Sequence, residues 1–124
     1  MTRLASILLA SLVPVSVLGK VALTGVSEAG LDFGAGNFPG NNGGSFFAPN
    51  PAAIAHTLAK GANTIRLPFL WERVQPSAGG SFDATYLGFI DTVIKQVTSA
   101  GAKVILDPHN YARYVNRRWD SNQW

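Results

Sequence analysis

A chain of 124 residues, 47% hydrophobic and only 14% charged, has the length and composition of a single globular domain. Its formal charge of +3 owes much to Arg3 near one end and to Arg117 and Arg118 near the other. The remainder is nearly balanced, which excludes the basic stripe of a nucleic-acid-binding protein. The sequence has no cysteine, which excludes a small disulfide-stapled domain.

Residues 1–19 have the pattern of a secretory signal peptide. Arg3 supplies the positive start, residues 4–18 form an apolar run, and cleavage is expected after Gly19. The run is shorter than the roughly 20 residues that a membrane-spanning helix needs. The sequence therefore predicts a secreted, extracellular protein with no membrane partner, whose mature chain begins at Lys20.

The first half of the mature chain predicts one helix between two strands. A short apolar strand is expected over residues 21–26, and a loop rich in glycine and asparagine follows over residues 34–45. Asn50, which precedes a proline, has the features of a helix N-cap, and Gly61 those of the residue that follows a helix. The second strand is predicted over residues 63–68.

Two features of this half could suggest a metal or a cofactor. His56 lies off the apolar face of the helix and has no second ligand at metal-binding spacing, so we expect an exposed side chain. The glycines of residues 34–40 have the wrong spacing for a dinucleotide-binding loop, and a proline stands where a helix should begin. The sequence therefore predicts no metal and no cofactor.

The second half predicts a longer helix over residues 83–100, which ends before Gly101. Its apolar face is expected at Tyr86, Ile90, Val93 and Val97, with Leu87 and Ile94 beside them. Residues 103–108 follow as a third strand, and their apolar start predicts burial on both faces in a parallel sheet. The alternation of strands and helices, and the similarity of residues 61–68 to residues 101–108, predict a repeated α/β unit with right-handed crossovers.

Polar side chains interrupt or end two of these strands. Arg66 lies between apolar neighbours, so its side chain faces the opposite way from theirs. Asp107 and His109 share one side of the third strand, and α/β proteins bind ligands at the carboxyl ends of parallel strands. We expect these three residues to share one site, in which the carboxylate fixes the tautomer of the imidazole and raises its basicity.

The same residues allow one structural alternative. An ion pair between Arg66 and Asp107 could serve only to tie two strands together. A metal site is excluded because a third ligand and an HExxH helix are missing. A serine hydrolase is excluded because no Gly-x-Ser-x-Gly elbow is present.

Three motifs occur in order along the chain: LTGVSEAGLDFG at residues 23–34, IRLPF at residues 65–69 and DPHNYAR at residues 107–113. Together, over roughly residues 20–114, they resemble the opening third of the secreted cellulases of glycoside hydrolase family 5, above all microbial endo-β-1,4-glucanases. The resemblance implies an α/β fold, an incomplete TIM (β/α)8 barrel with about three βα units. It also implies retaining hydrolysis of β-1,4-glucan by a monomer whose partner is the β-glucan polysaccharide.

The resemblance also assigns roles to individual residues. Arg66 would orient and charge-stabilise the nucleophilic carboxylate, and His109 would contact sugar in the cleft. Asn110 and Tyr111 would line the cleft beside His109. Glu28, at the end of the first strand, would border the site without matching a catalytic position.

Retaining glycosidases need two carboxyl groups about 5–5.5 Å apart. In the family these are glutamates at the ends of the fourth and seventh strands, the first within an Asn-Glu-Pro motif, and both are absent from this chain. Its only glutamates are Glu28 and Glu72, and Glu72 is predicted to be an acid in the first turn of a helix.

Residues 115–124 depart from the family pattern and suggest a truncated gene model. We expect the chain alone to be poorly folded and inactive.

Two other functions remain open. A small secreted non-catalytic domain could bind polysaccharide by stacking Trp71, Tyr111 and Trp119 on sugar rings, although Trp71 fits a core position equally well. A family member acting on mannan or β-1,3-glucan could carry the same motifs, because substrate preference resides largely in loops.

Overall fold

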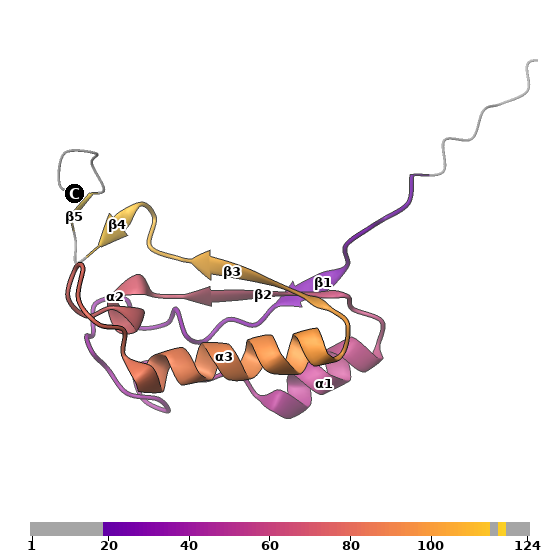
Figure 1. The fold of residues 1–124 in the computed structure, drawn as a ribbon, viewed down its shortest axis with the longest axis horizontal. Coiled ribbons are helices and arrows are strands. Elements are labelled where there is room, and N and C mark those ends of the chain that lie inside the picture. The colour runs from indigo at the N-terminus through magenta and orange to yellow at the C-terminus, as the bar shows by residue number, and fades with distance from the viewer. Residues whose placement is uncertain (1–18, 115–116, 119–124) are drawn as a thin grey trace, which may run out of the picture.

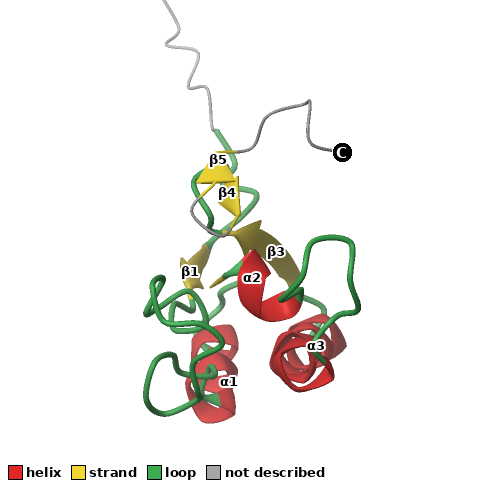
Figure 2. Cartoon of the chain, turned by 90° about the vertical axis from the view of Figure 1, so that its left-hand side faces the viewer, coloured by secondary structure: helices red, strands yellow, loops and turns green. Residues whose placement is uncertain are grey.

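The computed structural model describes residues 19–114 and 117–118, which form a parallel sheet with helices on one face (Figures 1 and 2). The sheet has the order β1-β2-β3, with β1 at Gly25–Ser27, β2 at Thr64–Phe69 and β3 at Lys103–Pro108. The helices are α1 (Pro51–Ala59), α2 (Trp71–Val74) and α3 (Ala84–Ser99). A short antiparallel ribbon beyond β3 consists of β4 (Arg113–Tyr114) and β5 (Arg117–Arg118).

This arrangement confirms the predicted alternation of strands and helices in a parallel sheet. The predicted signal peptide, apart from its last residue, lies outside the described residues, as does most of the predicted tail at 115–124. Within the described part of the chain, no helix has the length and apolar character needed to cross a membrane.

The two long helices begin and end where the sequence predicts. The Asn50 side chain accepts the Ala52 N–H at 2.9 Å at the start of α1, and Asp83 accepts the Tyr86 N–H at 2.7 Å at the start of α3. Gly61 follows α1 with φ 95° and Gly101 follows α3 with φ 76°, a region that favours glycine. A glycine with positive φ therefore ends the helix before β2 and the helix before β3 in the same way.

The core lies between the sheet and the long helices. Ile65 and Leu67 of β2 and Ile54 of α1 belong to this core and are fully buried. The predicted apolar face of α3 is confirmed, since its buried residues are Tyr86, Ile90, Val93 and Val97. Each such aliphatic side chain contributes about 1.5–3 kcal/mol by leaving water. The other face of β2 and β3 carries the polar residues Arg66 and Asp107, together with the apolar Ile105.

Arg73 of α2 holds the long loop between β1 and α1. Its side chain is buried, and its guanidinium donates to five backbone carbonyls, at 2.7–3.4 Å. The acceptors are Leu31, Phe33, Gly34, Asn37 and Pro39. The rings of Phe38 and Phe46 lie 5.6 and 4.7 Å from the guanidinium carbon. One cation thus replaces the regular hydrogen bonding that this irregular segment lacks.

The first strand is shorter than predicted and starts at Gly25 rather than at residue 21. The segment before it is held by the side chain of Asn63, which accepts the Thr24 N–H at 2.8 Å and donates to the Ala22 carbonyl at 3.0 Å. At Gly25 a Cβ atom would lie 1.7 Å from the Thr64 carbonyl oxygen, so the close approach of β1 to β2 requires glycine there.

The prediction that the third strand is buried on both faces is wrong. Ile105 and Leu106 of β3 are 48% and 47% exposed. β3 is the outermost strand of the described sheet, and neither of its faces is fully covered by a described element. His56, by contrast, is exposed on α1 as predicted.

Tyr86→Phe is expected to lower the free energy of unfolding by about 1–3 kcal/mol, because two buried backbone groups lose their partner. The Tyr86 hydroxyl donates to the Leu31 carbonyl at 2.6 Å and accepts the Leu70 N–H at 3.3 Å. Denaturant unfolding of the full-length product, wild type and variant, below pH 10 measures this loss. Tyr111→Phe, at an 80% exposed position, is the control.

The same variant should change how stability depends on pH. Burial raises the pKa of Tyr86 above 10, although its hydrogen bond with Leu70 and the nearby Arg73 oppose the shift. Because the fold favours the neutral phenol, this contribution is complete below pH 10 and is lost as the pH rises above it. The free energy of unfolding should therefore fall less steeply above pH 10 in Tyr86→Phe than in wild type. An equal fall in both proteins would contradict this account.

Candidate active site

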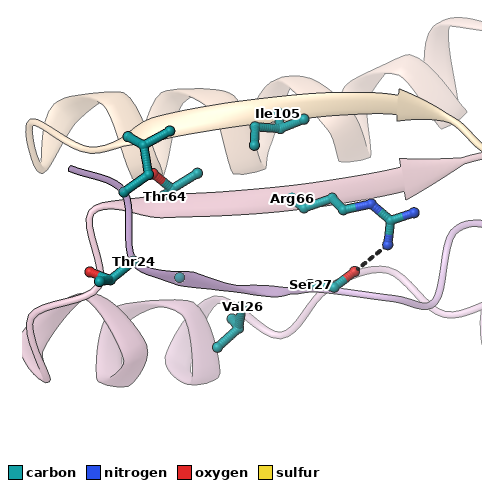
Figure 3. A pocket seen from close by; sticks show the side chains of 8 residues that line it. Thr24, Val26, Ser27, Thr64, Arg66 and Ile105 are labelled. Carbon is teal, nitrogen blue, oxygen red and sulfur yellow. Dashed lines mark hydrogen bonds between the residues drawn. The ribbon is translucent and has the colours of Figure 1, made fainter. Parts of the chain in front are cut away.

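The parallel register of β2 and β3 brings the predicted polar residues to one face of the sheet. Arg66 pairs with Ser27 on one side and with Ile105 on the other, so the three side chains share a face. Asp107 and His109 continue that face two and four residues beyond Ile105. Figure 3 shows Arg66 reaching along this face toward Ser27. Both residues line an open hollow of about 310 Å³.

Arg66 joins all three strands through its guanidinium. Nη2 forms an ion pair with Oδ2 of Asp107, and Nη1 donates to the Ser27 hydroxyl at 3.0 Å. The side chains of Arg66 and Asp107 are 40% and 27% exposed. An ion pair this accessible to water contributes little to stability. The geometry therefore confirms that Arg66 and Asp107 are in contact. Whether their ion pair only ties β2 and β3 together is a question for the double-mutant cycle below.

The imidazole of His109 lies against the same carboxylate. Nδ1 is 3.0 Å from Oδ2 of Asp107 and 3.2 Å from Nη2 of Arg66. Nδ1 thus lies between an acceptor, the Asp107 carboxylate, and a donor, the Arg66 guanidinium. We assign the proton to Nδ1, because the contact with the carboxylate is the shorter of the two. Nε2 is then left as an acceptor that faces away from the ion pair. This is the orientation by a carboxylate that the sequence predicts.

Asn110 is hydrogen-bonded to α2. Its Oδ1 accepts the Trp71 N–H at 2.9 Å, at the start of α2, and its Nδ2 donates to the carboxylate of Glu72. Its amide therefore links the end of β3 to α2, and its role in lining a cleft stays a prediction. Glu72 lies in the first turn of α2, as predicted, and is buried there.

Tyr111 and Glu28 lie at the same edge of the sheet but differ in their contacts. The Tyr111 hydroxyl is 2.9 Å from Nε2 of His109, and the two rings pack edge to face with centroids 4.7 Å apart. Glu28 follows β1, and its backbone N–H donates to the Arg66 carbonyl at 2.9 Å. Its half-buried side chain has no polar partner among the described residues. Their roles toward a ligand stay predictions.

Two aromatic residues beside the site pack on each other. The rings of Trp71 and Tyr114 are 5.9 Å apart, and the Trp71 indole N–H donates to the Gln75 side chain at 2.9 Å. The Tyr114 hydroxyl donates to the Gln75 carbonyl at 2.6 Å. Partial burial raises the pKa of Tyr114, and the negative charge of Glu72 raises it further. Trp71 thus has a packing role in the structure, while Trp119 lies outside the described residues.

The sequence analysis did not identify Ser27 or Arg73 as important. Ser27 follows a valine in a three-residue strand, and only the pairing of β1 with β2 brings it to Arg66. The sequence did give an indication for Arg73, since it is the cation of a mainly apolar and aromatic segment, residues 69–74, in which Glu72 is the other charged residue. Such a residue, next to a long glycine-rich loop, is a candidate to bind its carbonyls.

The sequence matches the family described as Cellulase (glycosyl hydrolase family 5) over residues 26–124. It is 46% identical over 91 residues to a probable endo-β-1,4-glucanase B of Aspergillus kawachii, which covers 73% of this chain and 27% of the relative. It is 42% identical over 100 residues to an endoglucanase of Neurospora crassa, which covers 80% and 26%.

Solved structures give the same result. The endoglucanase Cel5A of Pseudomonas stutzeri in complex with cellobiose is similar with a TM-score of 0.76 and 35% identity, over 84% of this chain and 32% of that one. XacCel5A in complex with cellopentaose also has a TM-score of 0.76, with 37% identity over 81% and 32%. The sheet and helices therefore correspond to part of a TIM barrel. The chain spans about a quarter to a third of the length of these relatives.

A double-mutant cycle will separate a structural from a functional use of the ion pair. With Arg66→Met, Asp107→Asn and the double variant, we expect a coupling in the free energy of unfolding of about 1 kcal/mol or less, because both side chains are partly exposed. A matched cycle with Glu72→Gln and Asn110→Ala should give a larger coupling, about 1.5–3 kcal/mol, because Glu72 is buried. A coupling of several kcal/mol between Arg66 and Asp107 would support the purely structural alternative.

Proposed function

The chain belongs to the cellulases of glycosyl hydrolase family 5, and from this premise we propose that it is part of a secreted, monomeric endo-β-1,4-glucanase. The single observation that carries the proposal is the cluster of Arg66, Asp107 and His109 at the carboxyl edge of the parallel sheet. In barrels of this kind, residues at that edge are the ones that act on substrates. Secretion rests on the signal-like pattern of residues 1–19.

In this proposal Arg66 serves the nucleophilic carboxylate of the reaction. A guanidinium beside a carboxylate favours its ionised form, which is the form that attacks the sugar. The bonds to Asp107 and Ser27 fix the guanidinium from two sides and leave it at the face of the sheet. A positive charge fixed in advance stabilises a developing negative charge without reorganising during the reaction.

His109 would contact a sugar hydroxyl through Nε2. The hydrogen bond of Nδ1 with Asp107 orients the ring, so that Nε2 points away from the ion pair and toward the Tyr111 hydroxyl. A neutral nitrogen that accepts a hydrogen bond suits a hydroxyl donor of the substrate. Asp107 is then a positioning residue, since it acts through Arg66 and His109.

The acid/base and the nucleophile would come from a further part of the protein. Retaining hydrolysis needs two carboxyl groups about 5–5.5 Å apart. Glu72 is bonded to Asn110 and buried in α2, and Asp107 is paired with Arg66, so neither is placed for this role. The small share of its relatives that the chain spans supports this view.

The names of the relatives favour β-1,4-glucan over mannan or β-1,3-glucan as the substrate. A non-catalytic carbohydrate-binding domain is less well supported. Such a domain would stack several aromatic faces on sugar rings. Tyr111 is exposed, but Trp71 is half-buried and packs on Tyr114, and Trp119 lies outside the described residues.

The product of the full-length transcript is expected to hydrolyse carboxymethylcellulose faster than mannan or β-1,3-glucan, and to release products of retained configuration, as measured by NMR of the anomeric protons. Arg66→Lys should lower kcat on the order of 10²-fold, because the lysine cannot keep both bonds of the guanidinium. Arg113→Lys, an exposed arginine of β4, is the matched control and should keep the wild-type kcat. Inverted products, or an unchanged kcat in Arg66→Lys, would contradict the proposal.

The 124-residue chain alone is expected to show no turnover of carboxymethylcellulose, because it lacks both catalytic glutamates. Purified material of this length, assayed beside the full-length product, gives the measurement. Sequencing of the transcript should reveal an in-frame Asn-Glu-Pro motif downstream. Turnover by the short chain, or a message that ends after Trp124, would refute this part of the proposal.

A further inference from the structure

Tyr111 covers the nitrogen of His109 that would bind sugar. Its hydroxyl lies 2.9 Å from Nε2, while Nδ1 is turned toward Asp107. Both ring nitrogens of His109 are therefore engaged. With the proton on Nδ1, the phenol donates and Nε2 accepts, as a sugar hydroxyl would do in its place.

The backbone at this point adopts an unfavourable conformation. Tyr111 and Ala112 have φ values of 51° and 54°, in the left-handed region where a side chain costs roughly 1–2 kcal/mol per residue. The ring of Tyr111 is 80% exposed, so burial offsets little of this cost. Strain of this kind concentrates at ligand sites and switch regions. The turn itself is fixed by the Arg113 N–H, which donates to the Asn110 carbonyl at 2.9 Å.

We propose that Tyr111 is a specificity-determining residue, whose hydroxyl occupies the place of a sugar hydroxyl on His109 and is displaced when a β-1,4-linked glucan binds. This inference rests on the proposed function. The exchange replaces one hydroxyl donor on Nε2 by another, so the hydrogen bond itself changes little. The exposed ring can rotate away without losing much buried surface.

This contact favours ligands that carry a hydroxyl donor at the position of the Tyr111 hydroxyl. A ligand that presents a hydroxyl at Nε2 compensates for the bond it breaks, whereas one without a donor there leaves the phenol in place. The contact of Tyr111 with Nε2 also lowers the apparent affinity of each ligand that binds Nε2, because only molecules with an uncovered Nε2 can bind it there.

Tyr111→Phe in the full-length product tests the proposal with cellopentaose as the probe. Without the phenol oxygen Nε2 is uncovered, so we expect KM to fall roughly 2- to 10-fold, the value of one hydrogen bond, with kcat unchanged. Tyr114→Phe is the matched control, because its hydroxyl bonds to Gln75 and not to His109, and its KM should not fall. An unchanged or raised KM in an active Tyr111→Phe enzyme overturns the proposed covering of Nε2 by Tyr111, while the proposed function stands. Absence of turnover in wild type and both variants overturns the proposed function, and the displacement by sugar with it.

The tautomer of His109 gives a second measurement that needs no activity. In wild-type protein labelled with ¹⁵N-histidine, the His109 signal, identified by its loss in His109→Gln, should report a protonated Nδ1 and an accepting Nε2. On addition of cellopentaose to protein inactivated at its downstream glutamates, the Nε2 signal should shift. A protonated Nε2 in the free protein would overturn the proposal, because His109 would then be the donor to Tyr111.

Discussion

The candidate site depends on the register between β2 and β3. Six residue pairs of parallel ladder place Pro68 beside Asp107 and Arg66 beside Ile105. Side chains alternate along a strand, so a slip by one residue would turn Asp107 and His109 toward the helices and leave Arg66 without a carboxylate. The register is already fixed where the two strands begin. The N–H of Lys103, the first residue of β3, donates at 2.9 Å to the carbonyl of Asn63, the residue before β2, just after each helix has ended at its glycine.

The parts of the fold that follow local rules could be predicted from the sequence. Asn50 and Asp83 begin helices because their side chains accept the free N–H groups of the first turn. The buried face of α3 follows from the spacing of its apolar residues. Arg66, Asp107 and His109 could be brought together because alternation along strands and the parallel order fix the face on which each lies.

The remainder depends on contacts between distant segments, which no local pattern encodes. The exposure of Ile105 depends on which elements cover β3, and a run of apolar residues does not reveal that. The bonds of the Asn110 amide to Trp71 and Glu72 depend on α2 lying against the end of β3, which the residues around Asn110 do not reveal. The carbonyls that bind Arg73 belong to an irregular loop whose path cannot be read from its glycines.

Asn110 and Tyr111, which follow His109 in the DPHNYAR turn, differ in how firmly they are held. Asn110 is bound on both ends of its amide to α2, which anchors the turn directly after His109. His109 itself is held at Nδ1 by Asp107, which Arg66 ties to the other strands. Among the described residues, the Tyr111 side chain has one hydrogen bond, and its ring is exposed. His109 is held independently of Tyr111, at Nδ1 by Asp107 and at its backbone N–H by the Phe69 carbonyl at 2.8 Å. In the proposed displacement, the phenol would therefore leave Nε2 without moving the imidazole, and a ligand would meet a nitrogen that is already oriented.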